Sequence, residues 1–263
     1  MRTEPRQAAQ DGKNTGCDPA MTGGGATCYL TSHGKVLCML ISHTRRFAFI
    51  HLPKTGGCSV KIALAPFADD PLAYAPNRWL NRCGIHANYF APWHHKRFRT
   101  HTPAAILYRE LPCDAFAELF TFAFVRNPWD LLVSSYHFLT RSREHRRGRV
   151  ALRLGSFARY VDYELTRGKL VQSRMLTSRH GRLLVDFVGR FETLDADFMT
   201  VCGHLGLCAR LPHVNAGSRG DYREHFTPAL AARVTDGFGE DIERFGYSFE
   251  PFRASLPAEK VAA

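Results

Sequence analysis

The sequence has no long hydrophobic run, and this absence excludes a membrane-spanning helix. Its longest uninterrupted apolar run, Val36–Ile41, has six residues, whereas a helix needs about 20 to cross a bilayer. Residues 1–16 begin with a positive charge but contain no apolar segment, so they do not resemble a secretory signal. We expect a cytoplasmic protein, and peripheral contact with a membrane stays open.

Cysteine pairs with the CxxC spacing are also absent. The eight cysteines are scattered along 263 residues, and a chain of this size can build a core without covalent cross-links. We therefore expect buried thiols of a reducing compartment rather than a disulfide framework. No metal site is expected, because the histidines and cysteines crowded between residues 83 and 113 include no CxxC or HxxxH pair.

Acidic residues are few compared with basic ones. The chain has 24 Asp and Glu against 35 Lys and Arg, a formal net charge of +11, and only seven of the basic residues are lysines. The planar guanidinium of arginine binds phosphate, sulfate and carboxylate groups. The partner is therefore expected to be anionic: a nucleotide, a nucleic acid, an acidic glycan or an anionic lipid surface.

Composition and periodicity predict one folded domain with a tail at each end. Hydrophobic residues at 45% and charged residues at 22% are typical of a soluble globular protein. Residues 1–38 are rich in Gly, Thr, Asn and Asp without any period, so we expect a disordered tail. The domain is assigned to residues 39–250 and a C-terminal tail to 251–263, with Met39 as an alternative natural start.

Buried strands alternate with helices in this domain. Three short apolar runs are typical of strands, and each is followed by a helical pattern: Arg46–Leu52, Leu119–Val125 and Leu183–Val188. Asn127 and Pro128 are an N-cap and a first helical residue. Further helices are expected over Leu194–Leu205 and Pro228–Arg244. The alternation predicts an α/β fold with a central parallel sheet covered on both faces.

The turn after the first strand is suited to binding an anion. In HLPKTGGCS, residues 51–59, Gly56 and Gly57 allow the backbone amides to converge, and the next helix N-terminus adds positive potential. Lys54 precedes the glycines, whereas the Walker A lysine follows the last glycine. An ordinary turn with a surface lysine stays open as the alternative.

A second candidate anion site follows the second strand, in RNPWDLLVSSY. Arg126 lies at the carboxyl end of that strand, the edge where open α/β folds bind ligands, and Ser134 can face the same side. Together they could hold a second phosphate. An arginine paired with an acidic neighbour, and a serine bonded within its helix, would explain both residues equally well.

Taken together, these two segments resemble the 5′-phosphosulfate loop (PKTGGTS) and the 3′-phosphate motif (RxPxxRxxS) of sulfotransferases that use 3′-phosphoadenosine 5′-phosphosulfate, PAPS. The later segments FVGRFETLDADF, LPHVNAGSRGDYREHF and DIERFGYSF resemble signatures of the bacterial sulfotransferase family 2, which is related to Golgi carbohydrate sulfotransferases. The similarity spans about residues 39–249. It implies a P-loop-like, three-layer α/β/α domain.

The resemblance also implies which residues bind the donor. Those expected to contact PAPS are Lys54, Thr55, Gly56, Gly57, Cys58, Ser59, Arg126, Ser134, Ser218 and Arg219. Two of the positions depart from the family pattern: Cys58 replaces the usual Thr, and Leu131 replaces the second Arg of RxPxxRxxS.

Sulfuryl transfer needs a base for the attacking hydroxyl and a cation at the leaving oxygen. Lys54 is suited to the second role. For the base we favour His101, because HTPAAILYREL resembles the family's His-x-x-Ala segment before the second motif. His86, in CGIHANY, resembles a segment of heparan 6-O-type enzymes and is the second candidate.

The predicted function is therefore transfer of the sulfuryl group from PAPS to a hydroxyl, on a saccharide or glycolipid, without a metal and without nucleic acid. The rival interpretation is a basic nucleotide- or nucleic-acid-binding protein without catalysis. A P-loop kinase is disfavoured by the position of Lys54. The arginine-rich stretch 141–149 is either a solvated surface or an attraction for a polyanionic acceptor.

Overall fold

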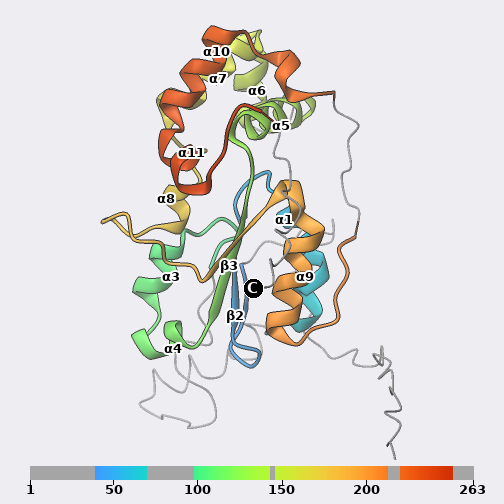
Figure 1. Cartoon of the computed structure of the whole chain (residues 1–263), viewed down its shortest axis with the longest axis vertical. Coiled ribbons are helices and arrows are strands. Elements are labelled where there is room, and N and C mark those ends of the chain that lie inside the picture. The colour runs from blue at the N-terminus through green and yellow to red at the C-terminus, as the bar shows by residue number, and fades with distance from the viewer. Residues whose placement is uncertain (1–38, 70–97, 143–145, 213–219, 251–263) are drawn as a thin grey trace, which may run out of the picture.

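A computed structural model describes residues 39–69, 98–142, 146–212 and 220–250, with a four-stranded sheet at its centre (Figure 1). The strands adjoin one another in chain order: β1 (Leu40–Ser42), β2 (Phe47–Ile50), β3 (Phe120–Val125) and β4 (Phe187–Arg190). The predicted tails, 1–38 and 251–263, lie outside the described residues.

The sheet is parallel except at one edge. β2 pairs with β3 in parallel, with Phe47 opposite Phe120, and β3 pairs with β4 in parallel. The predicted central parallel sheet is confirmed in β2, β3 and β4, and β1, which was not predicted, adds an antiparallel strand at the edge beside β2. The reason is the connection, because residues 43–46 are enough for a hairpin but far too few for a crossover between parallel strands.

Helices cover both faces of the sheet, which gives the predicted three layers (Figure 1). The phenylalanines of β2 and β3 pack against helices α1 (Gly57–Leu64) and α9 (Leu194–Leu205). The alternate residues of the same strands, such as Ala48 and Ala123, belong to the core on the other face. That face is covered by three short helices: α3 (Ala104–Glu110), α4 (Cys113–Ala117) and α8 (Ser173–Leu176).

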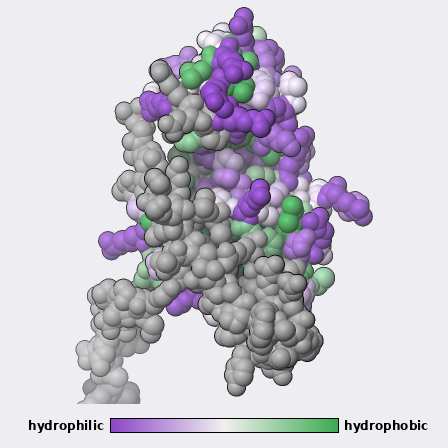
Figure 2. Space-filling model, turned by 180° about the vertical axis from the view of Figure 1, so that it is seen from behind, coloured by the Kyte–Doolittle hydropathy of each residue, from purple (hydrophilic) through white to green (hydrophobic). Residues whose placement is uncertain are grey.

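A lobe of helices extends beyond the carboxyl ends of the strands (Figure 1). It has its own core, which includes Trp129, Tyr160 and Phe238. Its members are α5 (Pro128–Arg141), α6 (Arg146–Leu154), α7 (Phe157–Arg167), α10 (Pro228–Gly237) and α11 (Gly239–Phe245). Seen from behind, much of its described surface is hydrophilic (Figure 2). None of the helices in the described ranges is both long and apolar enough to span a bilayer.

The remaining helical segments are single 3-10 turns, at Ala65–Phe67, Phe191–Thr193 and Tyr222–His225. The helix predicted after the second strand begins as expected: the Asn127 side chain accepts from the Trp129 N–H at 3.1 Å, and Pro128 is the first helical residue. α9 also has the predicted bounds.

Two predicted elements differ from the structure. The third parallel strand is Phe187–Arg190 rather than Leu183–Val188, because the Asp186 carboxylate accepts the Thr121 N–H that a backbone carbonyl would otherwise take. The single helix predicted over Pro228–Arg244 is two helices, α10 and α11, which meet at Phe238. Glycines on both sides of Phe238 favour the break, since glycine is a poor helix former.

The cysteine prediction is wrong in two respects. Cys208 is disulfide-bonded, whereas the other three described cysteines are free thiols. Of these, only Cys202 is buried, while Cys58 and Cys113 are exposed. An even scatter along the sequence does not show which thiols the fold brings together or leaves at the surface.

Candidate active site

The loop between β2 and α1 has the geometry of an anion-binding turn. Gly56 is left-handed, with φ +77°, and precedes the first residue of α1. It offers no side chain to cap the helix, so first-turn N–H groups remain for an anion. Gly57 is required by close packing, because a Cβ there would lie 2.1 Å from the imidazole of His51.

Lys54 is positioned by contacts with the second motif. Its backbone is left-handed, with φ +66°, and its carbonyl oxygen accepts from Arg126 Nη1 at 3.0 Å. Its ammonium lies 4.3 Å from the ring centroid of Phe138 on α5. Lys54, which is predicted to act at the leaving oxygen, therefore reaches from the loop to the helical lobe.

Arg126 joins the two predicted motifs, and it does so while buried. Its Nη1 donates to Ser134 Oγ at 3.0 Å as well as to the Lys54 carbonyl. Its Nε and Nη2 donate to Asp130 Oδ2 at 2.8 and 2.6 Å, and its guanidinium lies 3.9 Å from the ring centroid of Phe191. Arg126 and Ser134 are thus adjacent, as a shared phosphate site requires, and the acidic pairing considered as the alternative is present too.

The backbone of Arg126 is held by a residue that the sequence analysis missed. Gln172 accepts from the Arg126 N–H and donates to the Arg126 carbonyl, both at 2.8 Å. Gln172 is itself buried and bonded to Asp241 on α11. No local pattern marks a glutamine 46 positions away as the support of a strand end, so only the tertiary structure reveals it.

His101 lies beside the loop, in the tautomer that a general base needs. Its Nδ1 is 2.8 Å from the carbonyl oxygen of His51. Because a carbonyl only accepts hydrogen bonds, Nδ1 carries the proton and Nε2 carries the lone pair. The residue is exposed, so solvent and an acceptor can reach it. Burial of part of the ring lowers its pKa, and Lys61 acts in the same direction, against the hydrogen bond to His51.

Two further titratable groups, His51 and Lys61, lie near His101, and neither was predicted from the sequence. His51 is buried, its Nδ1 has no hydrogen-bond partner among the described residues, and its ring centroid is 4.7 Å from that of His101. Burial holds the pKa of His51 well below its ordinary value, with contributions from His101 and Lys61. Lys61 Nζ contacts Thr100 Oγ1 at 3.1 Å. The sequence could have indicated His51, because it lies at the end of a predicted strand directly before the glycine turn.

The other predicted loop residues have different environments. Thr55 is buried and its hydroxyl donates to the Leu52 carbonyl at 3.1 Å. Ser59 is buried in the first turn of α1, whereas Cys58 is an exposed thiol. The structure therefore brings together the loop, Arg126, Ser134 and His101, while His86, Ser218 and Arg219 lie outside the described residues.

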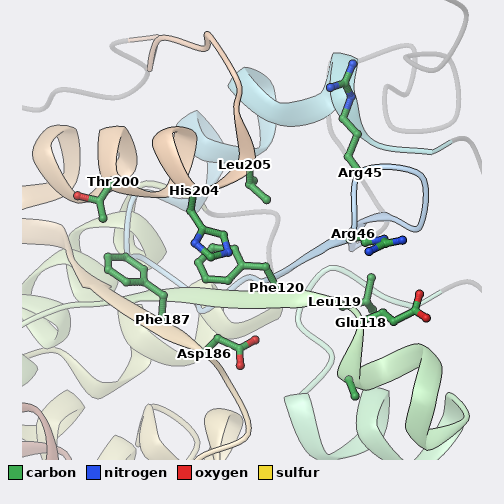
Figure 3. A pocket seen from close by; sticks show the side chains of 11 residues that line it. Arg45, Arg46, Glu118, Leu119, Phe120, Asp186, Phe187, Thr200, His204 and Leu205 are labelled. Atoms are coloured by element: carbon green, nitrogen blue, oxygen red, sulfur yellow. The ribbon is translucent and has the colours of Figure 1, made fainter.

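A separate hollow of about 680 Å³ opens at the opposite edge of the sheet, where β3 and β4 begin (Figure 3). The His204 ring stacks on Phe120 there, with centroids 3.8 Å apart. This hollow is remote from the loop and from His101. In the parts of the chain that the structure describes, no three His, Cys, Asp or Glu side chains form a group that could hold a metal ion.

The fold is that of an open α/β protein, a class that binds its ligands at the carboxyl ends of the strands, where this loop lies. The chain belongs to the sulfotransferase family, because the model of that family matches residues 38–248. This match includes the loop, His101 and Arg126. No curated protein matches the chain significantly. Membership makes the protein a transferase that moves a sulfuryl group from a sulfonate donor to an acceptor.

Proposed function

We propose that the donor is PAPS and that the acceptor is a hydroxyl on a saccharide or glycolipid, with His101 as the base. The observation that carries this proposal is the contact between His101 and the loop. The hydrogen bond from Nδ1 to the His51 carbonyl leaves Nε2 as the proton acceptor, and His51 itself lies three residues before Lys54 in the chain. A base and a cation thus flank the same anion-binding turn.

The donor would bind through two sets of contacts. The first-turn amides of α1 and the Lys54 ammonium would hold the 5′-phosphosulfate. Arg126 and Ser134 would hold the 3′-phosphate. This phosphate would compete with the Asp130 carboxylate for Arg126 Nη2, which is 2.6 Å from Asp130 in the present structure. Since Leu131 replaces the second arginine of the family motif, Arg126 carries more of this interaction alone.

In the proposed reaction, the acceptor oxygen attacks sulfur while its proton passes to His101 Nε2. The bond between sulfur and the bridging oxygen breaks, and its electron pair stays on the 5′-phosphate of the leaving nucleotide. Lys54 stabilises the charge that develops on this oxygen. The lowered pKa keeps His101 neutral near pH 7, so the base is ready to accept a proton.

The test is incubation with labelled PAPS and a panel of saccharides, glycolipids and small alcohols. We expect label on at least one hydroxyl acceptor, and we expect His101→Gln to lower turnover about 10²- to 10⁴-fold with nucleotide affinity nearly unchanged. Calorimetry supplies the control, with tighter binding of adenosine 3′,5′-bisphosphate than of ATP. Equal binding of ATP, without transfer to any acceptor, would favour the nucleotide-binding rival.

A further inference from the structure

Lys61 occupies an unusual position on α1. Lys61 is only 2% exposed, whereas the next residue, Ile62, is 42% exposed. A helix against a sheet normally buries the apolar side chain and exposes the charged one. Burying an ammonium costs free energy unless polar partners compensate. At Lys61 and Ile62 this pattern is reversed, because the charged residue is buried and the apolar one is exposed. Such departures from the usual pattern are expected at functional positions.

The buried ammonium connects α1 to the segment that carries His101. Lys61 Nζ is 3.1 Å from Thr100 Oγ1, one residue before His101. On the other side of the same segment, the His101 ring is bonded to the His51 carbonyl at 2.8 Å. The segment is thus held at two adjacent residues, from α1 and from the end of β2.

We propose that Lys61 is a positioning residue for His101, which it anchors through Thr100 and near which it places a positive charge. The inference rests on the proposed function, in which His101 is the base. Without these two contacts, the segment that carries His101 could rotate, and the imidazole would rotate with it. With both contacts in place, Nε2 keeps one direction relative to the loop.

The electrostatic part of the proposal follows from the groups that face His101. Among the described residues, those that influence its titration are His51, at the end of β2, and Lys61, on α1. His51 is kept neutral by burial, so Lys61 supplies the positive charge. A nearby positive charge disfavours the imidazolium, so removing it must raise the pKa of His101.

Two substitutions separate the charge from the anchor. Lys61→Met removes the charge and the donor but fills a similar volume. Thr100→Val removes the hydroxyl and keeps the lysine. Thr100→Ser restores the hydroxyl and is the matched control. Thermal unfolding of all three variants checks that they fold.

The first measurement is an NMR titration of histidine-labelled protein, with the His101 signal assigned by its loss in His101→Gln. Lys61→Met should raise the pKa of His101 and move the acidic limb of the kcat/KM profile to higher pH. Thr100→Val should lower kcat about tenfold by misplacing the base, with the donor KM unchanged, and Thr100→Ser should recover most of the loss.

An unchanged His101 pKa in Lys61→Met overturns the inference, whether or not the protein is active. A wild-type kcat in Thr100→Val also overturns it. This second variant keeps the inference testable if Lys61→Met fails to fold. A raised pKa in a protein that transfers no sulfuryl group to any acceptor has a different meaning. In that case the coupling between Lys61 and His101 stands and the proposed function fails.

Discussion

At the residue scale, Lys54 shows how much of the site depends on backbone conformation. A left-handed backbone costs a residue other than glycine about 1–2 kcal/mol, and Lys54 adopts it with φ +66°. The contact from Arg126 to its carbonyl oxygen helps to offset this cost. The direction of the lysine side chain is therefore set by the second motif as well as by its own loop.

Substitution of Lys54 should mainly lower kcat, whereas substitution of Arg126 should mainly lower nucleotide affinity. Lys54→Ala removes a charge that matters most as the leaving oxygen becomes negative, so kcat should fall more than nucleotide affinity does. Arg126→Ala removes a charge-assisted contact worth about 1.5–3 kcal/mol, so affinity for adenosine 3′,5′-bisphosphate should fall about ten- to a hundredfold. Steady-state kinetics and calorimetry on both variants measure the contrast.

Adenosine 5′-phosphosulfate, which lacks the 3′-phosphate, is the control for this contrast. Its weak binding should change far less in Arg126→Ala than the binding of the bisphosphate. Lys54→Ala should still impair any transfer from it. Equal weakening of both nucleotides by Arg126→Ala would show that Arg126 acts only through the Lys54 backbone and does not bind the 3′-phosphate.

At the scale of elements, the β2–α1 unit depends on the close approach of Gly57 to His51. A Cβ at Gly57 would lie 2.1 Å from the buried imidazole, and overpacking of this kind typically costs about 1–3 kcal/mol. Gly57→Ala should therefore lower both the melting temperature and the transfer rate, because the displaced ring is next to His101. Thermal unfolding and kinetics test this.

Gly203 is the matched control for Gly57, since it is also a helical glycine. A Cβ at Gly203, on α9, would meet no atom within 4 Å. Gly203→Ala should therefore leave activity unchanged and stabilise the protein by up to about 1 kcal/mol through helix propensity. A Gly57→Ala protein as stable and active as Gly203→Ala would contradict the packing described for the loop.

At the scale of the whole molecule, the buried histidine links stability to pH. The pKa of His51 is well below 6.5 in the folded protein, so below pH 6.5 the unfolded chain binds a proton that the folded chain excludes. Stability from this group is therefore complete above pH 6.5 and falls as the pH falls toward the folded pKa. The lowered pKa of His101 acts with the same sign.

His51→Phe should remove the contribution of His51 while keeping a ring against Phe49 and Gly57. The melting temperature of the variant, relative to wild type, should rise as the pH is lowered from 7 to 5.5. This comparison cancels the buried carboxyls Glu192 and Asp241, whose pKa values are raised by burial and which act with the opposite sign. A constant difference across this range would show that the pKa of His51 is the same in the folded and the unfolded protein.

Local chemistry was sufficient for the features that a few adjacent residues decide. The cap at Asn127, the turn at Gly56 and the strand-to-helix alternation depend on side chains within one or two turns, so the sequence alone predicted them. Arg126 was predicted from its place at the end of a strand, whereas His101 was predicted from the resemblance of HTPAAILYREL to a family segment. Their assigned roles as base and 3′-phosphate ligand stay predictions.

Contacts between distant segments were decided only by the tertiary structure. Gln172 supports Arg126 from 46 positions away, and Lys61 meets Thr100 across 39 positions. The sequence alone determined where the anion loop begins and which residue types it carries. The packing of α1 against the end of β2 and the segment before α3 decided that His101, a buried lysine and a buried histidine lie together there. The physical reason is that these groups come from separate segments, and their burial changes the cost of carrying a charge.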